Sequence, residues 1–230
     1  MQHRTVQDVM TPQVVTVRRD TPFKRVAELL AGNDVTAVPV VDGGNHPIGI
    51  VSDSDLLRKE LVQPEPDDRS PVPWLHPRDR ARAEAETAEG LMSTLVITAR
   101  PEWSIVEAAR TMDHHHVKRL PVINESGVLI GVVSRGDLLR VFLRHDSAIR
   151  EEIVHDVLER TLLLAPDAVH VQVLDGVVTL TGEIGRRSTL PVVLRLCRTV
   201  DGVVAVHDRL TGSFDDHRTE PGPAAVHGAL

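Results

Sequence analysis

The hydrophobic positions of the N-terminal part follow a pattern of short strands and amphipathic helices. β-branched runs at 14–17, 38–42 and 48–51 are typical of strands. Between the first two runs, apolar residues recur with helical spacing over 26–30. Polar residues at 52–55 resemble a cap for a further helix beginning at Leu56. The order strand, helix, strand, strand, helix predicts an α/β unit.

Helix boundaries are marked by capping residues. Thr5 is predicted to be the N-cap of a short turn of helix over 5–10. Thr21 and Pro22 are expected to start the next helix, because Thr can cap and Pro suits the first helical position. Gly32, Asn33 and Asp34 are expected to stop it.

The same pattern occurs a second time, 82 residues later. Residues 88–142 align with 6–60 without a gap, and Met10, Pro39 and Asp55 meet Met92, Pro121 and Asp137. Strands are therefore expected at 96–98, 120–123 and 130–133, and a helix at 104–113. A repeated supersecondary unit usually buries its open face on its neighbour, which predicts one pseudo-symmetric module with a cleft between the copies.

The C-terminal part has a different pattern. Ile149, Ile153, Val157 and Leu158 predict an amphipathic helix, whose outer face would carry Glu151, Glu152 and Glu159. Residues 168–174 alternate with period two, Asp175-Gly176 is a hairpin signal, and 177–182 is the expected partner strand. A helix at 188–200 and a strand at 202–210 complete a small α+β layer.

These patterns divide the chain as follows. The first repeat spans 1–61, a charged, Pro-rich linker 62–86, the second repeat 87–145, the α+β domain 147–213, and a tail expected to be disordered 214–230.

Composition narrows the class of protein. Apolar residues make up 41% and charged residues 26%, as in ordinary soluble globular proteins. The net charge of −7 argues against a general nucleic-acid binder. Cys197, the single cysteine, cannot form an internal disulfide, and the N-terminus has no apolar leader. We therefore expect a cytoplasmic protein.

The motif VMT…VVTV…VPVVD…GIVSxxDLL of the first repeat, many positions of which agree in the second at matched spacing, resembles the CBS domain. Two in tandem resemble a Bateman module over about residues 5–144. The resemblance implies an α/β fold with two sheets related by a pseudo-two-fold axis, and a cleft that often binds AMP, ADP, ATP or S-adenosylmethionine.

The resemblance also implies site residues, since a carboxylate can accept hydrogen bonds from both ribose hydroxyls. The ribose residues would be Asp137 and Asp55. The phosphate residues would be Ser134, Arg135, Lys118, Arg119 and Ser52, where a hydroxyl and a helix N-terminus suit an anion. The residues near adenine would be Thr98, Thr16, Pro121 and Pro39.

The two sites are expected to be unequal. Lys118, Arg119 and Arg135 match Thr36, Ala37 and Asp53 in the first repeat. We therefore expect the Asp137 site to prefer phosphorylated ligands and the Asp55 site to bind weakly or stay empty. An alternative is that each Ser-x-x-Asp is only a helix cap.

A cluster of histidines, His114–His116, is the other conspicuous group. Neighbouring histidines point in different directions on a helix and rarely bind one metal together. A helix end at the surface is the preferred interpretation, so no metal site and no resident cofactor are expected.

The C-terminal motif VHVQVLDGVVTLTGEI, followed by a helix and VDGVVAVHDRL, resembles the BON domain. Members of that family are often linked to phospholipid or membrane surfaces, although no basic or aromatic membrane face is evident in this sequence.

The leading hypothesis is a non-enzymatic sensor. An adenine nucleotide would bind between the repeats, and the BON domain would pass the change to an unknown protein partner or a membrane surface. The alternative is a ligand-free scaffold that only dimerises. No set of nucleophile, base and orienting group indicates an enzyme. Apolar stripes on the repeat helices predict a homodimer.

Overall fold

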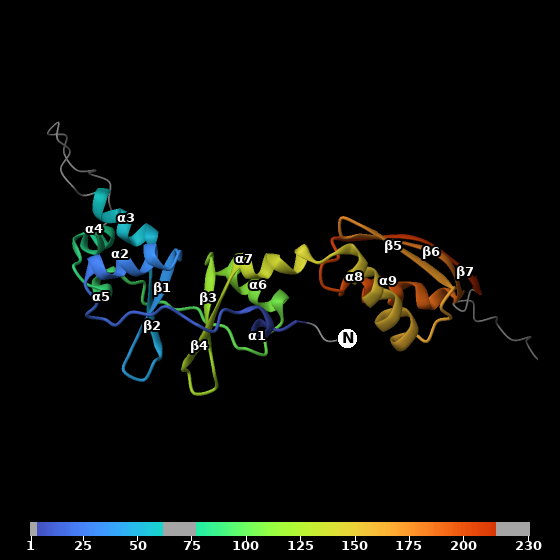
Figure 1. Cartoon of the computed structure of the whole chain (residues 1–230), viewed down its shortest axis with the longest axis horizontal. Helices are drawn as coiled ribbons and strands as arrows, with labels where there is room; N and C mark the ends of the chain where they lie inside the picture. Colours follow the sequence, from blue (N-terminus) through green and yellow to red (C-terminus); the bar gives the residue numbers. More distant parts are fainter. Residues whose placement is uncertain (1–3, 62–76, 215–230) are drawn as a thin grey trace, which may run out of the picture. The chain divides into compact units, whose positions relative to one another are not determined.

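The computed structural model describes residues 4–61 and 77–214 (Figure 1). Contacts divide these residues into two compact units, Arg4–Leu138 and the residues from Leu139 onward. The predicted tail, apart from residue 214, and linker residues 62–76 lie outside the described residues. Within the described ranges, no helix is both long enough and apolar enough to cross a membrane.

The first unit contains both repeats, and apart from the first predicted strand of each, their elements follow in the predicted order. Those of the first repeat are α1 (Val6–Val9), α2 (Phe23–Gly32), β1 (Ala37–Val41), β2 (Pro47–Ser52) and α3 (Asp53–Leu61). After α4 (Pro77–Glu84), those of the second are α5 (Ala88–Leu91), α6 (Ile105–His114), β3 (Arg119–Ile123), β4 (Leu129–Ser134) and α7 (Arg135–Leu139).

Each repeat is built on an antiparallel strand pair. β1 pairs with β2, with Ala37 opposite Ser52, and β3 pairs with β4, with Arg119 opposite Ser134. The predicted strands at 14–17 and 96–98 are wrong, since the chain makes only single parallel bridges, at Val17 and at Ala99. Extending either ladder backwards would need an N–H from Pro39 or Pro121, and proline has none.

The structure confirms one of three predicted helix starts. Thr5 is the N-cap of α1, with a capping box to Asp8. Thr21 does not cap α2, which starts one residue later than predicted. Its N-cap is Pro22, and Thr21 Oγ1 accepts instead from the N–H of Arg18 at 2.9 Å. α3 starts at Asp53, three residues before the predicted Leu56.

The two repeats exchange their N-terminal segments. Val6 of α1 is fully buried in the second repeat's core with Leu120, Val122 and Val133. Ala88, Leu91 and Met92 belong to the core of the first repeat. The domain boundaries predicted from the sequence therefore do not coincide with the hydrophobic cores.

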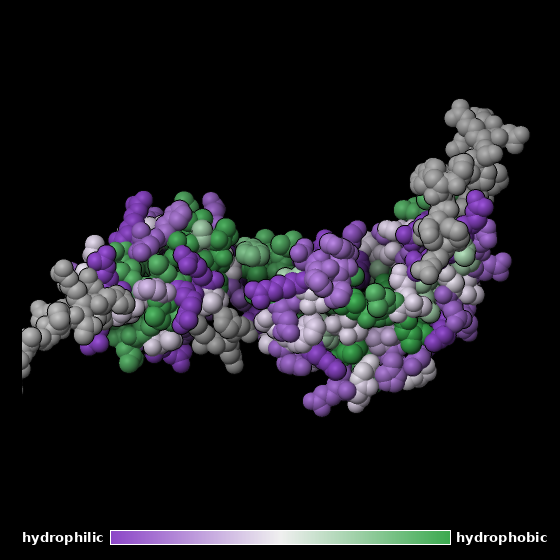
Figure 2. Space-filling view, turned by 180° about the vertical axis from the view of Figure 1, so that it is seen from behind, coloured by the Kyte–Doolittle hydropathy of each residue, from purple (hydrophilic) through white to green (hydrophobic). Residues whose placement is uncertain are grey.

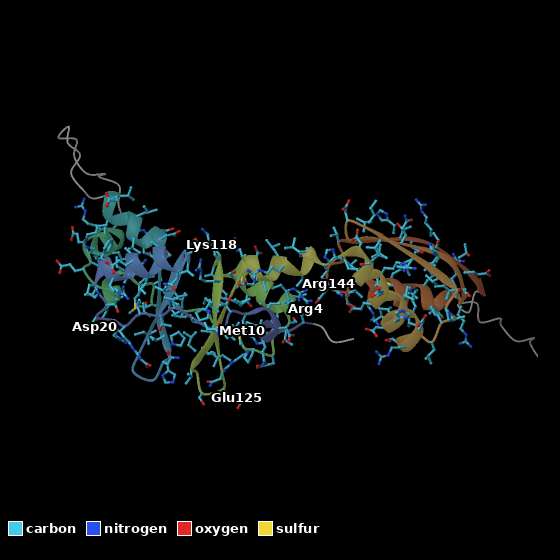
Figure 3. The ribbon with its side chains drawn as sticks, viewed as in Figure 1. Arg4, Met10, Asp20, Lys118, Glu125 and Arg144 are labelled. Carbon is cyan, nitrogen blue, oxygen red and sulfur yellow. The ribbon has the colours of Figure 1, made fainter. Side chains whose placement is uncertain are left out.

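Methionines mark this exchange at each sheet. Met10 lies beside β4, where its sulfur covers Gly131, and Met92 covers Gly49 in the same way (Figure 3). Backbone bridges from Thr11 to Val132 and from Ser93 to Ile50 fix both crossings.

The second unit is the predicted α+β layer. A 3-10 helix (η1, Arg140–Leu143) leads into α8 (Asp146–Glu152), which continues as a π-helix (η2, Ile153–Thr161). Strands β5 (Val169–Leu174), β6 (Val177–Arg186) and β7 (Ala205–Phe214) form the sheet, in the order β5-β6-β7. A short 3-10 turn (η3, Arg187–Thr189) and α9 (Leu190–Arg198) connect β6 to β7, which run parallel.

Packing in this unit follows the predicted alternation. Ile149, Ile153 and Val157 of the first helix bury against the sheet with Val171 and Leu180. Asp175 and Gly176 form the predicted hairpin turn, both at positive φ. Glu152 was placed on the outer face, which is wrong. It is partly buried and accepts from Arg144 Nη1 at 2.7 Å.

Candidate functional site

Each repeat places a buried aspartate against a serine at a strand end. Ser134 donates to Asp137 Oδ2 from its N–H at 2.9 Å and from Oγ at 2.6 Å. Ser52 makes the same two bonds to Asp55 Oδ2, at 2.9 and 2.6 Å. Asp55 and Asp137 are the only buried charged residues among those described. A buried carboxylate held this way has a fixed orientation, as recognition of a ligand hydroxyl requires.

The Asp55 carboxylate also has a cationic partner that the sequence analysis missed. Arg58 Nη1 donates to Asp55 Oδ1 at 2.6 Å, so both oxygens of this carboxylate bind protein groups. The spacing i, i+3 on a helix was a usable signal for this pair. A ribose at Asp55 would therefore have to share this carboxylate with Arg58 or displace it.

Two of the predicted phosphate residues come together at the start of α7. The N–H of Arg135 donates to the carbonyl of Lys118 at 3.0 Å, which brings both residues next to Ser134. Both side chains are exposed, and Figure 3 shows Lys118 just before β3. In the first repeat the same backbone bond joins Asp53 to Thr36, also at 3.0 Å. The matching position of the first repeat therefore has one negative charge and no lysine.

The side chain of Arg119 crosses to the first repeat. Its Nη1 donates to the carbonyl of Ala37 at 3.1 Å, and its Nη2 donates to Thr36 Oγ1. Burial lowers the pKa of Arg119, and the carboxylates of Asp53 and Asp137 oppose that shift. Sequence matching assigned Arg119 to the second repeat alone. Alignment of the repeats could not reveal this contact, because it joins one repeat to the other.

The four residues predicted near adenine lie side by side in pairs. Val17, which follows Thr16, donates its N–H to the carbonyl of Pro39 at 3.1 Å. Ala99, which follows Thr98, makes the equivalent bond to Pro121 at 2.9 Å. Both prolines are buried and both threonines are half-buried.

The histidine cluster forms the end of a helix. His114 is the last residue of α6, His115 is its C-cap, and His116 adopts φ 53°. The matching residue Asp34, after α2, adopts φ 52°. Among the described residues, no group of three or more potential ligands could hold a metal ion. Burial raises the pKa of the Cys197 thiol to about 12, so its thiolate is scarce at neutral pH.

Comparisons with known proteins agree with this architecture. The CBS domain family matches residues 6–61 and 88–144, and the BON domain family matches 145–212. The CBS domain-containing protein YhcV of Bacillus subtilis is 29% identical over 144 residues, which cover 63% of this chain and 89% of YhcV. A homoserine O-acetyltransferase of Methanococcoides burtonii is 28% identical over 139 residues, but these cover only 24% of that enzyme.

Among solved structures, the crystal structure of CBSX2 in complex with AMP has a TM-score of 0.53 at 28% identity, covering 61% of this chain and 97% of that one. CBSX2 is a protein of Arabidopsis thaliana. The chain therefore belongs to the tandem CBS-domain proteins and carries a C-terminal BON domain.

Proposed function

We propose that the CBS pair is a sensor for an adenine nucleotide and that the protein is regulatory rather than enzymatic. The observation that carries this proposal is the Ser134–Asp137 pair. A buried, oriented carboxylate lies next to a strand end where a backbone hydrogen bond brings the cationic residues Lys118 and Arg135 together. The similarity to CBSX2, whose structure contains AMP, supports the same ligand class.

Each group in this site has a chemical role. Asp137 accepts hydrogen bonds from the ribose hydroxyls, and Ser134 keeps the carboxylate oriented. Lys118 and Arg135 neutralise the phosphate, and the backbone around Thr98 and Pro121 faces the adenine. The Asp55 site has the same framework, with Ser52, Thr16 and Pro39, but Thr36 and Asp53 stand where the second repeat has the cations Lys118 and Arg135. It therefore binds nucleotide more weakly.

The regulatory step requires two states of the CBS pair. A nucleotide changes their populations only if it binds one state more tightly than the other. In this proposal the BON domain communicates the change to a protein partner or to a membrane surface.

Assembly is a separate part of the proposal. Leu57 and Leu61 on α3 are 64% and 46% exposed, and Val106 on α6 is 56% exposed. Apolar residues of this kind, green in Figure 2, lie among hydrophilic ones on the surface of the molecule. We infer a homodimer that buries these helical faces. Light scattering at micromolar concentration should give twice the chain mass, and a monomer would contradict the inference.

The test of the sensor is a ligand panel followed by variants. Calorimetry with AMP, ADP, ATP and S-adenosylmethionine should detect binding of at least one. Asp137→Ala should weaken it about ten- to a hundredfold, because charged hydrogen bonds contribute roughly 1.5–3 kcal/mol each. Asp55→Ala, the matched control in the other repeat, should change it little.

The variant Asp137→Asn keeps the shape of the side chain, so it separates a loss of ligand binding from a loss of folding. It should lose nucleotide affinity while its melting temperature stays close to that of Asp55→Asn. Absence of any thermal shift at millimolar ligand would favour the scaffold alternative, and multiple turnover of ATP would overturn the non-enzymatic assignment.

A further inference from the structure

Arg119 lies beside the axis that relates the two repeats. The shift of 82 residues makes Ala37 its counterpart, and the Arg119 guanidinium binds the carbonyl of that same residue. A residue that contacts its own counterpart must lie next to the pseudo-two-fold axis. The backbone of Arg119 pairs with Ser134, and that of Ala37 pairs with Ser52. Arg119 is therefore close to the serine of each repeat.

The charges around Arg119 also come from both repeats. Asp53 at the start of α3 and Asp137 in α7 both interact with its guanidinium. Arginine stays protonated at neutral pH even when it is half-buried. The charge of one carboxylate from each repeat therefore acts on this guanidinium.

The contact with Thr36 connects Arg119 to the first repeat's helix. Arg119 Nη2 donates to Thr36 Oγ1, while the carbonyl of Thr36 accepts the N–H of Asp53 at 3.0 Å. Asp53 is the first residue of α3, which carries Asp55. Any movement of the guanidinium therefore acts on the segment that positions the Asp55 carboxylate.

The position of the first repeat that matches Arg119 has no cationic side chain that could contact the second repeat in return. That position is Ala37, whose methyl group cannot bind an anion. The two nucleotide sites of the proposed function therefore have one axial guanidinium between them.

We propose that the two sites share Arg119 and compete for it, so that a phosphorylated ligand in one site weakens phosphate binding in the other. This inference rests on the proposed function. Ala37 and Thr36 already take two of the five N–H donors of Arg119, so one phosphate that occupies its planar fork leaves too few donors for a second phosphate. Binding energy at one site is then linked to the other site, and the linkage is reciprocal. Adenosine, which has no phosphate, should not show it.

The experiment is a calorimetric cycle with AMP and adenosine as probes. Asp55→Ala and Asp137→Ala each leave one site, so the product of their two association constants predicts binding without competition. In the wild type the product of the two AMP association constants should fall short of that prediction by about tenfold or more, the scale of typical coupling. With adenosine the two products should agree.

The same cycle in an Arg119→Ala background removes the shared cation. The AMP shortfall should disappear, and the tighter AMP site should weaken about tenfold while adenosine changes little. Arg100→Ala is the matched control, because the Arg100 guanidinium is also half-buried and donates to a backbone carbonyl, that of Asn124. It should leave the AMP shortfall unchanged. A shortfall that persists in Arg119→Ala would overturn the inference.

A ligand-free measurement separates this inference from the proposed function. Hydrogen exchange should accelerate over residues 36–55 in Arg119→Ala but not in Arg100→Ala, since only the former contacts Thr36 and Ala37. Unchanged exchange would refute the link itself. Binding of AMP without competition would refute only the sharing of Arg119, whereas a wild type that binds neither AMP nor adenosine would refute the proposed function as well.

Discussion

The two CBS repeats share their backbone bonding and differ in charge. In both, a serine makes bonds of 2.9 and 2.6 Å to a buried aspartate, and a 3.0 Å backbone bond ties the helix start to the residue just before β1 or β3. At three matched positions, however, Lys118, Arg119 and Arg135 stand where the first repeat has Thr36, Ala37 and Asp53.

This difference separates what the fold requires from what a ligand requires. Lys118 and Arg135 are exposed, and substitutions at exposed positions change stability little. The aspartates of the Ser–Asp pairs are buried and hydrogen-bonded, so the fold alone gives a reason to keep both pairs. The second repeat can therefore be specialised for an anion while the first keeps the same framework.

The largest difference between the two repeats is expected where the exchanged N-terminal segments pack against the sheets. A Cβ on Gly49 would lie 2.9 Å from Met92 Cβ, and closer still to its sulfur. A Cβ on Gly131 would meet mainly the flexible end of Met10, at 2.5 Å from Sδ and 3.2 Å from Cγ. Gly49→Ala should therefore cost about 3 kcal/mol of unfolding free energy and Gly131→Ala about 1 kcal/mol.

Urea unfolding of the two glycine variants, followed by circular dichroism, measures this difference. Equal losses would mean that both methionines move aside equally well, and the two crossings would then be equivalent.

Substitution of Lys118 tests the difference in charge between the two sites. Lys118→Ala should weaken AMP about tenfold, because a phosphate loses a charged partner, and change adenosine less than about twofold. Lys24→Ala is the control, since Lys24 is an exposed lysine on α2 of the first repeat. Calorimetry with both ligands decides it, and an equal loss of AMP and adenosine would show that Lys118 does not act on phosphate.

The helix ends provide a smaller, symmetric test. His116 and Asp34 both hold left-handed backbone after their helices, which favours glycine. His116→Gly and Asp34→Gly should each stabilise the protein by up to about 1 kcal/mol, with the smaller gain at Asp34 because Asp tolerates this conformation well. Chemical denaturation measures both, and a destabilised His116→Gly would indicate that its imidazole makes an important contact.

The smallest effect concerns the BON unit. His155 Nδ1 lies 2.8 Å from Glu159, and this hydrogen bond, with the charge of Glu159, raises the pKa of His155 above 6.5. A raised pKa stabilises the folded state below pH 6.5, and that contribution is lost as the pH rises through the folded value. The melting temperature of His155→Gln should therefore fall below that of the wild type near pH 5 and match it near pH 9. A deficit that is independent of pH would assign the effect to packing.

Much of the fold was predictable because the same pattern of strand, helix and turn signals occurs in both repeats. The hairpins around 42–47 and 124–128, the cap Thr5, and the turn at Asp175-Gly176 all follow from local sequence signals. The predicted strands at 14–17 and 96–98 failed because their pairing depends on which partner residue is a proline.

Part of the predicted site comes together within a repeat: Ser134 binds Asp137, Ser52 binds Asp55, and the backbones of Lys118 and Arg135 are hydrogen-bonded. The contacts that join the repeats were not predictable in this way. The contact of Arg119 with Ala37 and the exchange of α1 and α5 depend on packing between segments about 80 residues apart. A comparison of one copy with the other contains no information on such contacts.

The exchanged segments also set the order in which this chain can fold during synthesis. A ribosome that has released residues up to 61 has made every strand of the first repeat, but not Ala88, Leu91 and Met92, which complete its core. Val6 and Met10 must wait longer still, until β3 and β4 have emerged. The core of the first repeat can therefore close once residue 92 is free, whereas that of the second can close only after residue 138 has emerged.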